Sequence, residues 1–205
     1  MSKNVLIIFT RNPELGKVKT RLAKTIGDQA ALNIYKYLLN HTELTVKDLV
    51  CDKAIYYSEN VNDHDVWDNS TYQKFAQNGN DLGERMLNAF KVAFDDNYEK
   101  VIIIGSDLID LQAKHFLEAF QKLDTHDFVI GPAHDGGYYL LGMRKLHKHL
   151  FREKKWGTSS VLRDTLHDLQ NLNVFLLEEL NDIDIYDDIK NNTKLNSLID
   201  SCRNT

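Results

Sequence analysis

The segment NVLIIFTRNPELGKVKTRL, residues 4–22, decides the fold. It begins with an uninterrupted apolar run over residues 5–9 and then changes abruptly to basic and polar residues. A run that is apolar at every position is typical of a strand covered on both faces, as in a parallel sheet. The same pattern returns over residues 101–104, so we predict two central strands of one sheet.

The rest of the chain alternates between helical and strand patterns. Apolar residues at helical spacing predict helices over residues 28–42, 82–94, 113–123, 159–169 and most of 185–198. Shorter apolar runs predict strands over residues 54–57, 71–76, 128–130, 138–143 and 174–177. This alternation predicts an α/β sandwich around a largely parallel sheet. No linker or repeat interrupts it, so we expect residues 1–205 to form a single domain.

Composition narrows the possible partners. The chain has 205 residues and a formal net charge of −5, which argues against a nucleic-acid or membrane partner. Any anion site must then be a local cluster of basic residues. Cys51 and Cys202 fit no metal-binding spacing and are expected to be free thiols in a reducing compartment. The first apolar run is too short for a signal peptide or a membrane span, so we expect a cytoplasmic protein.

The loop after the first predicted strand holds four basic residues, Arg11, Lys17, Lys19 and Arg21, together with Gly16. In α/β folds, ligands bind where loops leave the carboxyl ends of strands. Arginine and lysine suit phosphate oxygens, and a glycine lets the backbone approach a ligand closely. We therefore predict a phosphate-binding loop. Its spacing is not that of a P-loop, and a solvated basic turn is the alternative.

A second loop precedes the helix predicted at residues 82–94 and places Asp81 between Gly79 and Gly83. The position of Asp81 favours a role as the N-cap of that helix. The alternative is that Asp81, Arg85 and the exposed helix start together hold an anionic ligand.

Two aspartates are candidate metal ligands. Asp107 follows the strand at residues 101–104, where a carboxylate can hold Mg²⁺ together with phosphate oxygens. The alternative for Asp107 is a turn residue that bonds its own backbone. Asp184, within NDIDIYDD at residues 181–188, is a candidate second carboxylate, and an acidic cap on the last helix is its alternative.

In the stretch IGPAHDGGYYLLGM, residues 130–143, a proline, His134, Asp135 and two adjacent glycines, Gly136 and Gly137, lie between two apolar runs. The two glycines permit a backbone conformation or a close approach that other residues resist. Asp-Gly is also a hairpin signal, so Asp135 is either a turn residue or a side chain in a cleft. Tyr138 and its neighbour alternate faces, so one is expected in the core and one in a cleft. Trp156 is a further candidate to cover an apolar or sugar face.

These motifs, in this order, resemble the small bacterial glycosyltransferase-A-like family, some members of which are described as arsenosugar-biosynthesis glycosyltransferases. More distantly, the chain is similar to nucleotidyltransferases such as the molybdenum-cofactor guanylyltransferases. The resemblance covers nearly the whole chain. It rests on FTRNPELGKVKTRL (residues 9–22), DLGERM (81–86), IGSD (104–107), GPAHDGGYYLLG (131–142), Trp156 and DID (182–184).

The resemblance implies a nucleotide-diphospho-sugar transferase (GT-A) fold, a three-layer, Rossmann-like α/β/α sandwich that binds a nucleotide and Mg²⁺ or Mn²⁺. Matched residue by residue, the loop from Arg11 to Arg21 would meet phosphates, Asp107 would hold the metal, and the Asp135 loop would line the acceptor side. Two positions depart from the pattern. Many relatives have proline where Ile109 stands, and threonine and proline where residues 185–186 are isoleucine and tyrosine.

Three functions fit these motifs, and we rank them in this order. Glycosyl transfer from a nucleoside diphosphate sugar to a small acceptor would use Asp107 for the metal and Asp135 as general base. Lys17, Lys19 and Arg21 would stabilise the diphosphate. Nucleotidyl transfer from an NTP to a phosphorylated acceptor would release pyrophosphate and need no side-chain base. A nucleotide-binding protein without turnover is the third possibility, motivated by the two departures.

Overall fold

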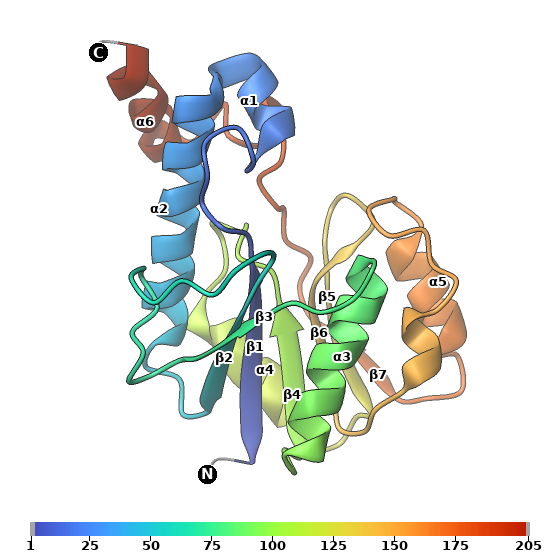
Figure 1. Cartoon of the computed structure of the whole chain (residues 1–205). Coiled ribbons are helices and arrows are strands. Elements are labelled where there is room, and N and C mark those ends of the chain that lie inside the picture. Colours follow the sequence, from blue (N-terminus) through green and yellow to red (C-terminus); the bar gives the residue numbers. More distant parts are fainter. Residues whose placement is uncertain (1–2, 204–205) are drawn as a thin grey trace.

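The predicted strands form one seven-stranded sheet in a computed structural model of the chain, which describes residues 3–203 (Figure 1). The strand order is β3-β2-β1-β4-β6-β5-β7. The strands are β1 Asn4–Thr10, β2 Asp52–Tyr57, β3 Gln73–Ala76, β4 Lys100–Ile104, β5 Phe128–Pro132, β6 Tyr138–Met143 and β7 Val174–Leu176.

The sheet is mainly parallel, as predicted, with β6 as the exception. Ile8 of β1 is in register with Ile55 of β2 and Ile104 of β4, and all three strands run the same way. β6 runs antiparallel to both β4 and β5, because the short turn over residues 133–137 joins β5 and β6 as a hairpin. The Asp-Gly hairpin signal was therefore correct. Its consequence is that β6 begins at the same edge of the sheet where β1 and β4 end.

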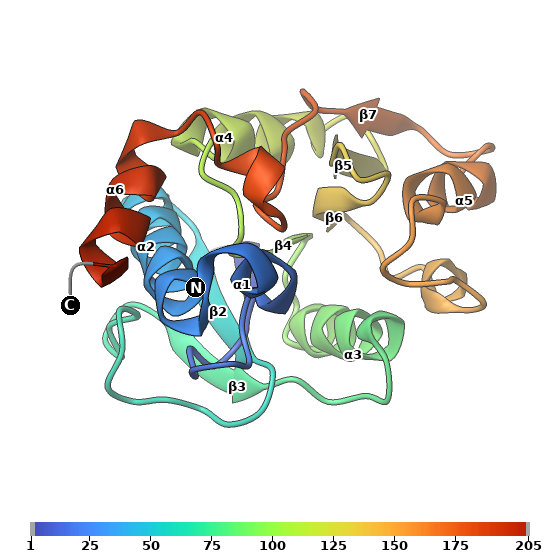
Figure 2. The same cartoon turned by 90° about the horizontal axis from the view of Figure 1, so that it is seen from above.

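Helices cover both faces of the sheet, giving the expected three layers (Figure 2). The α2 and α4 helices lie on one face, α3 and α5 lie on the other, and α1 and α6 pack beside the upper part of α2. The helices are α1 Thr20–Ile26, α2 Asp28–Val46, α3 Leu82–Asp95, α4 Ala113–Lys122, α5 Val161–Asp168 and α6 Thr193–Arg203, with short 3-10 helices η1 Lys148–Phe151 and η2 Tyr186–Asp188.

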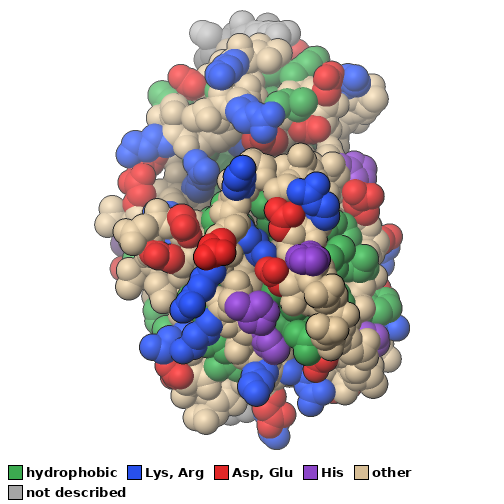
Figure 3. All heavy atoms as spheres, turned by 90° about the vertical axis from the view of Figure 1, so that its right-hand side faces the viewer, with side chains coloured by type: hydrophobic (Ala, Val, Ile, Leu, Met, Phe, Trp, Pro, Cys, Tyr) green, Lys and Arg blue, Asp and Glu red, His purple; other side chains and the backbone are tan. Residues whose placement is uncertain are grey.

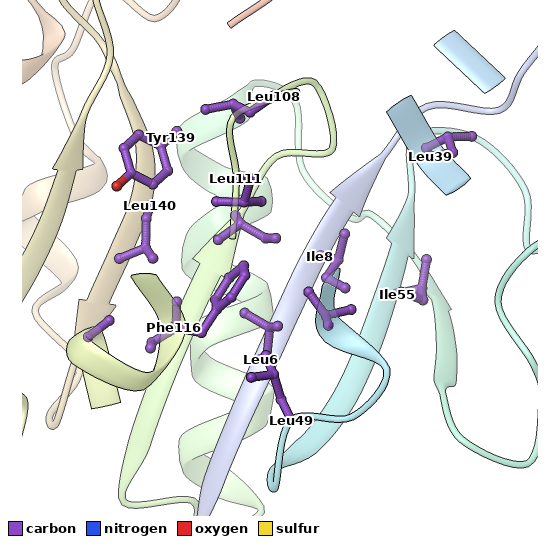
Figure 4. Packing of buried hydrophobic residues seen from close by; sticks show 14 of the residues in the cluster. Leu6, Ile8, Leu39, Leu49, Ile55, Leu108, Leu111, Phe116, Tyr139 and Leu140 are labelled. Atoms are coloured by element: carbon purple, nitrogen blue, oxygen red, sulfur yellow. The ribbon is translucent and has the colours of Figure 1, made fainter. Parts of the chain in front are cut away.

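The continuous apolar runs are buried on both sides because successive strand residues point to opposite faces. Leu6 and Ile8 pack against the layer of α2 and α4, which includes Phe116 (Figure 4). Val5 and Ile7 pack in the other layer, against Phe90 of α3 and its neighbours. Burial on both faces explains why these strands could be predicted from sequence.

Two segments differ from the sequence-based prediction. The helix predicted over most of residues 185–198 begins only at Thr193, because the Asp188 carboxylate accepts the backbone N–H groups of Asp184 and Ile185 and holds that part in η2. In addition, α1 begins at Thr20, near the end of the basic loop, and continues to Ile26, where no helix was predicted. None of the helices within residues 3–203 is long and apolar enough to cross a membrane.

The face on the side of α5 carries a mixed set of charges. Figure 3 shows Lys and Arg side chains interspersed with Asp and Glu, and histidines among them, over this side of the molecule. Opposite charges that lie this close screen one another, so no single-sign field dominates this view of the surface.

Candidate active site

A pocket of about 280 Å³ opens at the edge of the sheet where β1 and β4 end and β6 begins. Its floor comes from strand residues that include Phe9, Ile103 and Tyr138. Its sides come from Leu82 and Met86 of α3, from the start of α5, and from the turn that precedes α5. The pocket thus lies at the loop-bearing edge where the sequence predicted ligand binding.

Three carboxylates line this pocket: Asp107, Asp135 and Asp182. Asp107 lies on the loop after β4, Asp135 in the β5–β6 hairpin, and Asp182 on the segment after β7. The backbone N–H of Ile183 donates to the carbonyl of Asp107 at 3.1 Å, which ties the last segment to the loop after β4. Leu180 forms an isolated parallel bridge with Ala133, which brings the same segment to the hairpin.

The carboxylates interact electrostatically. Burial raises the pKa of Asp182 above its usual value, and the charges of Asp135 and, less strongly, Asp107 raise it further. The Lys19 ammonium acts in the opposite direction and favours ionised Asp182. A carboxyl group with a raised pKa among other acids is a feature of catalytic sites, because it is poised to exchange a proton.

Lys19 is held against Asp107. Its Nζ lies 2.9 Å from Asp107 Oδ2, and its side chain is only 5% exposed. The residue stands just before α1 with φ 48° and ψ 42°, a left-handed conformation that costs a lysine free energy. The Tyr35 hydroxyl lies on the same side of the sheet, where it accepts the backbone N–H of Arg11 at 2.8 Å. Burial, followed by the charge of Asp107, raises the pKa of Tyr35 to about 12.

The other basic residues of the loop point in different directions. Arg21 pairs with Asp184. Lys17 pairs with Glu14 at 2.6 Å, and this contact is the main reason that its pKa is raised. Arg11 lines a separate cavity on the side of α2. The structure therefore brings Lys19 and Arg21 to the aspartates and leaves Arg11 and Lys17 apart from them, with Gly16 in an exposed turn at φ 74°.

Asp81 and Arg85 serve the local structure. The Asp81 carboxylate accepts the backbone N–H of Glu84 at 2.8 Å, so Asp81 is the N-cap that the sequence favoured. Arg85 Nε donates to the carbonyl of Gly79 at 3.1 Å. Neither residue lines the pocket, and the prediction that they bind phosphate gains no support from their positions.

The hairpin places its residues unequally. Asp135 Oδ1 accepts the backbone N–H of Gly137 at 2.7 Å, so Asp135 is both a turn residue and a pocket residue. Gly137 and Tyr138 also line the pocket. His134 is exposed and does not line it, whereas Gly136 packs at φ +86° against the backbone of Ser159. The two glycines thus have different uses, and Gly136 fixes the hairpin to the turn before α5.

Trp156 forms one wall of the pocket, as a side chain that covers an apolar face would. Its indole packs against Gly83 of α3, where a Cβ atom would lie 2.4 Å from the indole nitrogen. On the floor, Phe9 stacks on Tyr56 with ring centroids 5.7 Å apart, and Tyr56 stacks on Phe75. Trp156 and Phe9 are therefore both held in place by packing outside the pocket.

Asp184 was the sequence-based candidate for a second metal carboxylate, but the structure favours Asp182. Asp184 pairs with Arg21 and does not line the pocket, whereas Asp182 lines it beside Asp107 and Asp135. The two aspartates flank Ile183, which is buried. The sequence did not show which of the two meets Asp107. The departures from the family pattern, Ile109 and residues 185–186, also lie outside the pocket lining.

A divalent cation fits this site only if the substrate supplies part of its coordination shell. Within residues 3–203, no group of three or more His, Cys, Asp or Glu side chains is arranged to hold a metal ion. Magnesium, however, is commonly bound through one or two carboxylates together with substrate phosphates and water. Asp107 and Asp182 could supply those carboxylates, although Lys19 already engages one oxygen of Asp107.

Replacing Asp182 with asparagine is expected to raise the free energy of unfolding at pH 7. Because the pKa of Asp182 is raised in the folded state, the ionised carboxylate destabilises that state. The protonated carboxyl group makes a favourable contribution, which is fully present below the unfolded pKa and is lost as the pH rises through the folded pKa. The gain from Asp182→Asn should therefore shrink as the pH is lowered toward about 4. Urea unfolding of both proteins at several pH values measures it, and a variant less stable than the parent at pH 7 would contradict the argument.

Comparisons with known proteins identify the family of the chain. Residues 42–158 match a family model described as an uncharacterized protein conserved in bacteria (DUF2064). A crystal structure from Desulfovibrio desulfuricans, provisionally described as a nucleotide-diphospho-sugar transferase, is 33% identical over 98% of each chain, with a TM-score of 0.86. No curated protein matches the sequence.

More distant structures share the fold alone. The 4-diphosphocytidyl-2C-methyl-D-erythritol synthase of Anaerococcus prevotii is 14% identical over 96% of each chain, with a TM-score of 0.61. A CMP:2-keto-3-deoxy-manno-octonic acid synthetase, solved with CTP, is 9% identical over 98% of this chain and 99% of that one, with a TM-score of 0.55. The chain therefore belongs to the DUF2064 family and to the wider family of nucleotide-diphospho-sugar transferase-like transferases.

Proposed function

We propose that this transferase moves a glycosyl group from a nucleoside diphosphate sugar to a hydroxyl group of a small acceptor. One observation carries the proposal: three carboxylates line the pocket, and no lysine or arginine is among its lining residues in the described part of the chain. A hydroxyl nucleophile must lose a proton, which a carboxylate can accept. A phosphorylated acceptor, as nucleotidyl transfer needs, would instead face like charges.

The diphosphate of the donor would lie outside the pocket, between Asp107 and the start of α1. Lys19 and Arg21 would supply positive charge there, and the exposed Arg21 side chain can turn from its partner Asp184 toward an oxygen of the leaving group. Mg²⁺ or Mn²⁺, held by Asp107 and Asp182, would neutralise the departing diphosphate as a Lewis acid.

The proton of the acceptor would go to Asp135, because Asp182 would be engaged with the metal. Asp135 keeps one oxygen on the Gly137 N–H, which fixes its carboxylate at the pocket. A carboxylate acts as a general base only while it is ionised, so the activity is expected to fall as the pH is lowered into the range where carboxyl groups take up a proton.

Nucleotidyl transfer is the second candidate because Lys19 and Arg21, the two basic residues that reach the aspartates, would also suit the charge of a triphosphate. Nucleotide-sugar and NTP binding can be separated by a thermal-shift panel with and without Mg²⁺ or Mn²⁺, since a ligand of the native state raises the melting temperature by mass action. We expect a nucleotide sugar to stabilise the protein only with metal. Stabilisation by NTPs alone would favour nucleotidyl transfer, and no shift with any nucleotide would contradict both.

A further inference from the structure

The most deeply buried lining of the pocket is apolar, since Met86 and Leu141 are almost inaccessible, whereas Asp107 and Asp135 are more exposed and lie toward its mouth. Its lining includes Phe9, Leu82, Met86, Tyr138, Leu141 and Trp156. These side chains belong to four separate parts of the chain, β1, α3, β6 and the turn before α5. Most of them also belong to the core layer on the side of α3, so the pocket is a recess at the upper end of that layer.

The recess is held open by packing around it. Trp156 is seated against Gly83, where a Cβ atom would lie 2.6 Å from the carbonyl oxygen of Phe151 as well as against the indole. Phe9 is supported by its stack on Tyr56. A cavity of about 150 Å³ lined by apolar side chains is enough for a benzene-sized ligand, and this pocket measures about 280 Å³.

The pocket lining also includes an exposed apolar side chain at the start of α3, at the rim of the recess. Leu82 is 44% exposed at the first position of α3, beside the acidic cap Asp81. Val92 of the same helix is exposed to nearly the same extent, 43%, but does not line the pocket. The two residues therefore form a matched pair for testing whether the rim binds a ligand.

We infer that the acceptor is an uncharged or cationic molecule with an aromatic or similarly apolar group that fills the recess. Its hydroxyl group then points to Asp135 and Asp182 at the mouth. An anionic acceptor is disfavoured because three carboxylates surround that point. The role of this ligand as the acceptor rests on the proposed glycosyl transfer. The preference for an apolar, non-anionic ligand is a property of the pocket and can be measured without a donor.

The test uses three small probes: benzyl alcohol, benzyl phosphate and glycerol. Each is titrated into the full chain by ligand-observed NMR, with tryptophan fluorescence as a second readout, since Trp156 lines the pocket and the other tryptophan, Trp67, is buried beside Tyr72. We expect benzyl alcohol to bind at least about tenfold more tightly than either other probe. Trp156→Phe should remove the fluorescence change without abolishing the NMR signal of binding.

The matched variants locate the binding. Leu82→Gln is expected to weaken benzyl alcohol several-fold, and Val92→Gln should leave the affinity unchanged. Equal binding of benzyl phosphate, or equal effects of the two variants, would overturn the inference. So would displacement of benzyl alcohol by a nucleoside diphosphate with Mg²⁺, because the recess would then be the nucleobase site. Failure of glycosyl transfer itself would appear separately, as no turnover of any nucleotide sugar in a protein that still binds benzyl alcohol.

Discussion

Replacing Asp107 with asparagine is expected to reduce metal-dependent transfer by about a thousandfold and to abolish the effect of Mg²⁺ on nucleotide binding. The reason is that a metal stabilises the charge of the transition state by several kcal/mol, and each 1.4 kcal/mol corresponds to a tenfold change in rate. Calorimetric titration of the nucleotide with and without Mg²⁺ measures the binding, and donor turnover measures the rate.

Asparagine is the informative replacement because Asp107 also holds the buried ammonium of Lys19. An alanine would leave that ammonium without its acceptor and would confound loss of metal with loss of stability. Asp110→Asn is the control, since Asp110 is exposed, lies on the same loop and does not line the pocket. Metal-dependent binding that persists undiminished in Asp107→Asn would refute the metal role of Asp107.

Replacing Gly136 with alanine is expected to lower the free energy of unfolding by about 3 kcal/mol. About 1 kcal/mol comes from placing a Cβ on a residue with φ +86°. The rest, about 2 kcal/mol, comes from overpacking, because the Cβ would lie 2.3 Å from the carbonyl oxygen of Ser159. That neighbour is backbone, so it cannot rotate away.

Gly157→Ala separates the two contributions. Gly157 also has a positive φ, +77°, but a Cβ there would have no heavy atom within 4 Å. We expect it to cost about 1 kcal/mol, the conformational part alone. Denaturant unfolding of the two variants gives the comparison, provided that the m-values agree. Equal losses would mean that the contact between the hairpin and the turn before α5 contributes little to the stability of the site.

The sequence predicted the strands well because a strand that is buried on both faces is apolar at every position, whichever strands lie beside it. The run over residues 5–9 is apolar whichever strands flank it, and the same holds for residues 101–104. The direction of β6 could not be predicted from its apolar run, because such a run fits a parallel and an antiparallel strand equally well. Only the Asp-Gly turn indicated a hairpin. The start of α6 was wrong because Asp188 binds backbone N–H groups, and no periodicity records such a contact.

The site was predictable where strand ends determine it. Asp107, Asp135 and Tyr138 meet because their strands end or begin at one edge of the sheet. Asp182 was missed as a pocket residue because it follows a strand of three residues, and its place depends on the bridge between Ala133 and Leu180. The orientation of the Lys17 side chain could not be predicted either, because an exposed, flexible lysine side chain pairs with whichever acid is near, here Glu14.

The most direct test of the account is product analysis with a nucleotide sugar that stabilises the protein, incubated with Mg²⁺ and benzyl alcohol as a model acceptor. Glycosyl transfer predicts release of the nucleoside diphosphate, slow without acceptor and faster with it, and loss of both rates in Asp107→Asn. A release rate that benzyl alcohol does not change would contradict glycosyl transfer to such an acceptor. In a parallel incubation with an NTP and a phosphorylated acceptor, release of pyrophosphate with transfer of the nucleotidyl group would assign the site to the second chemistry.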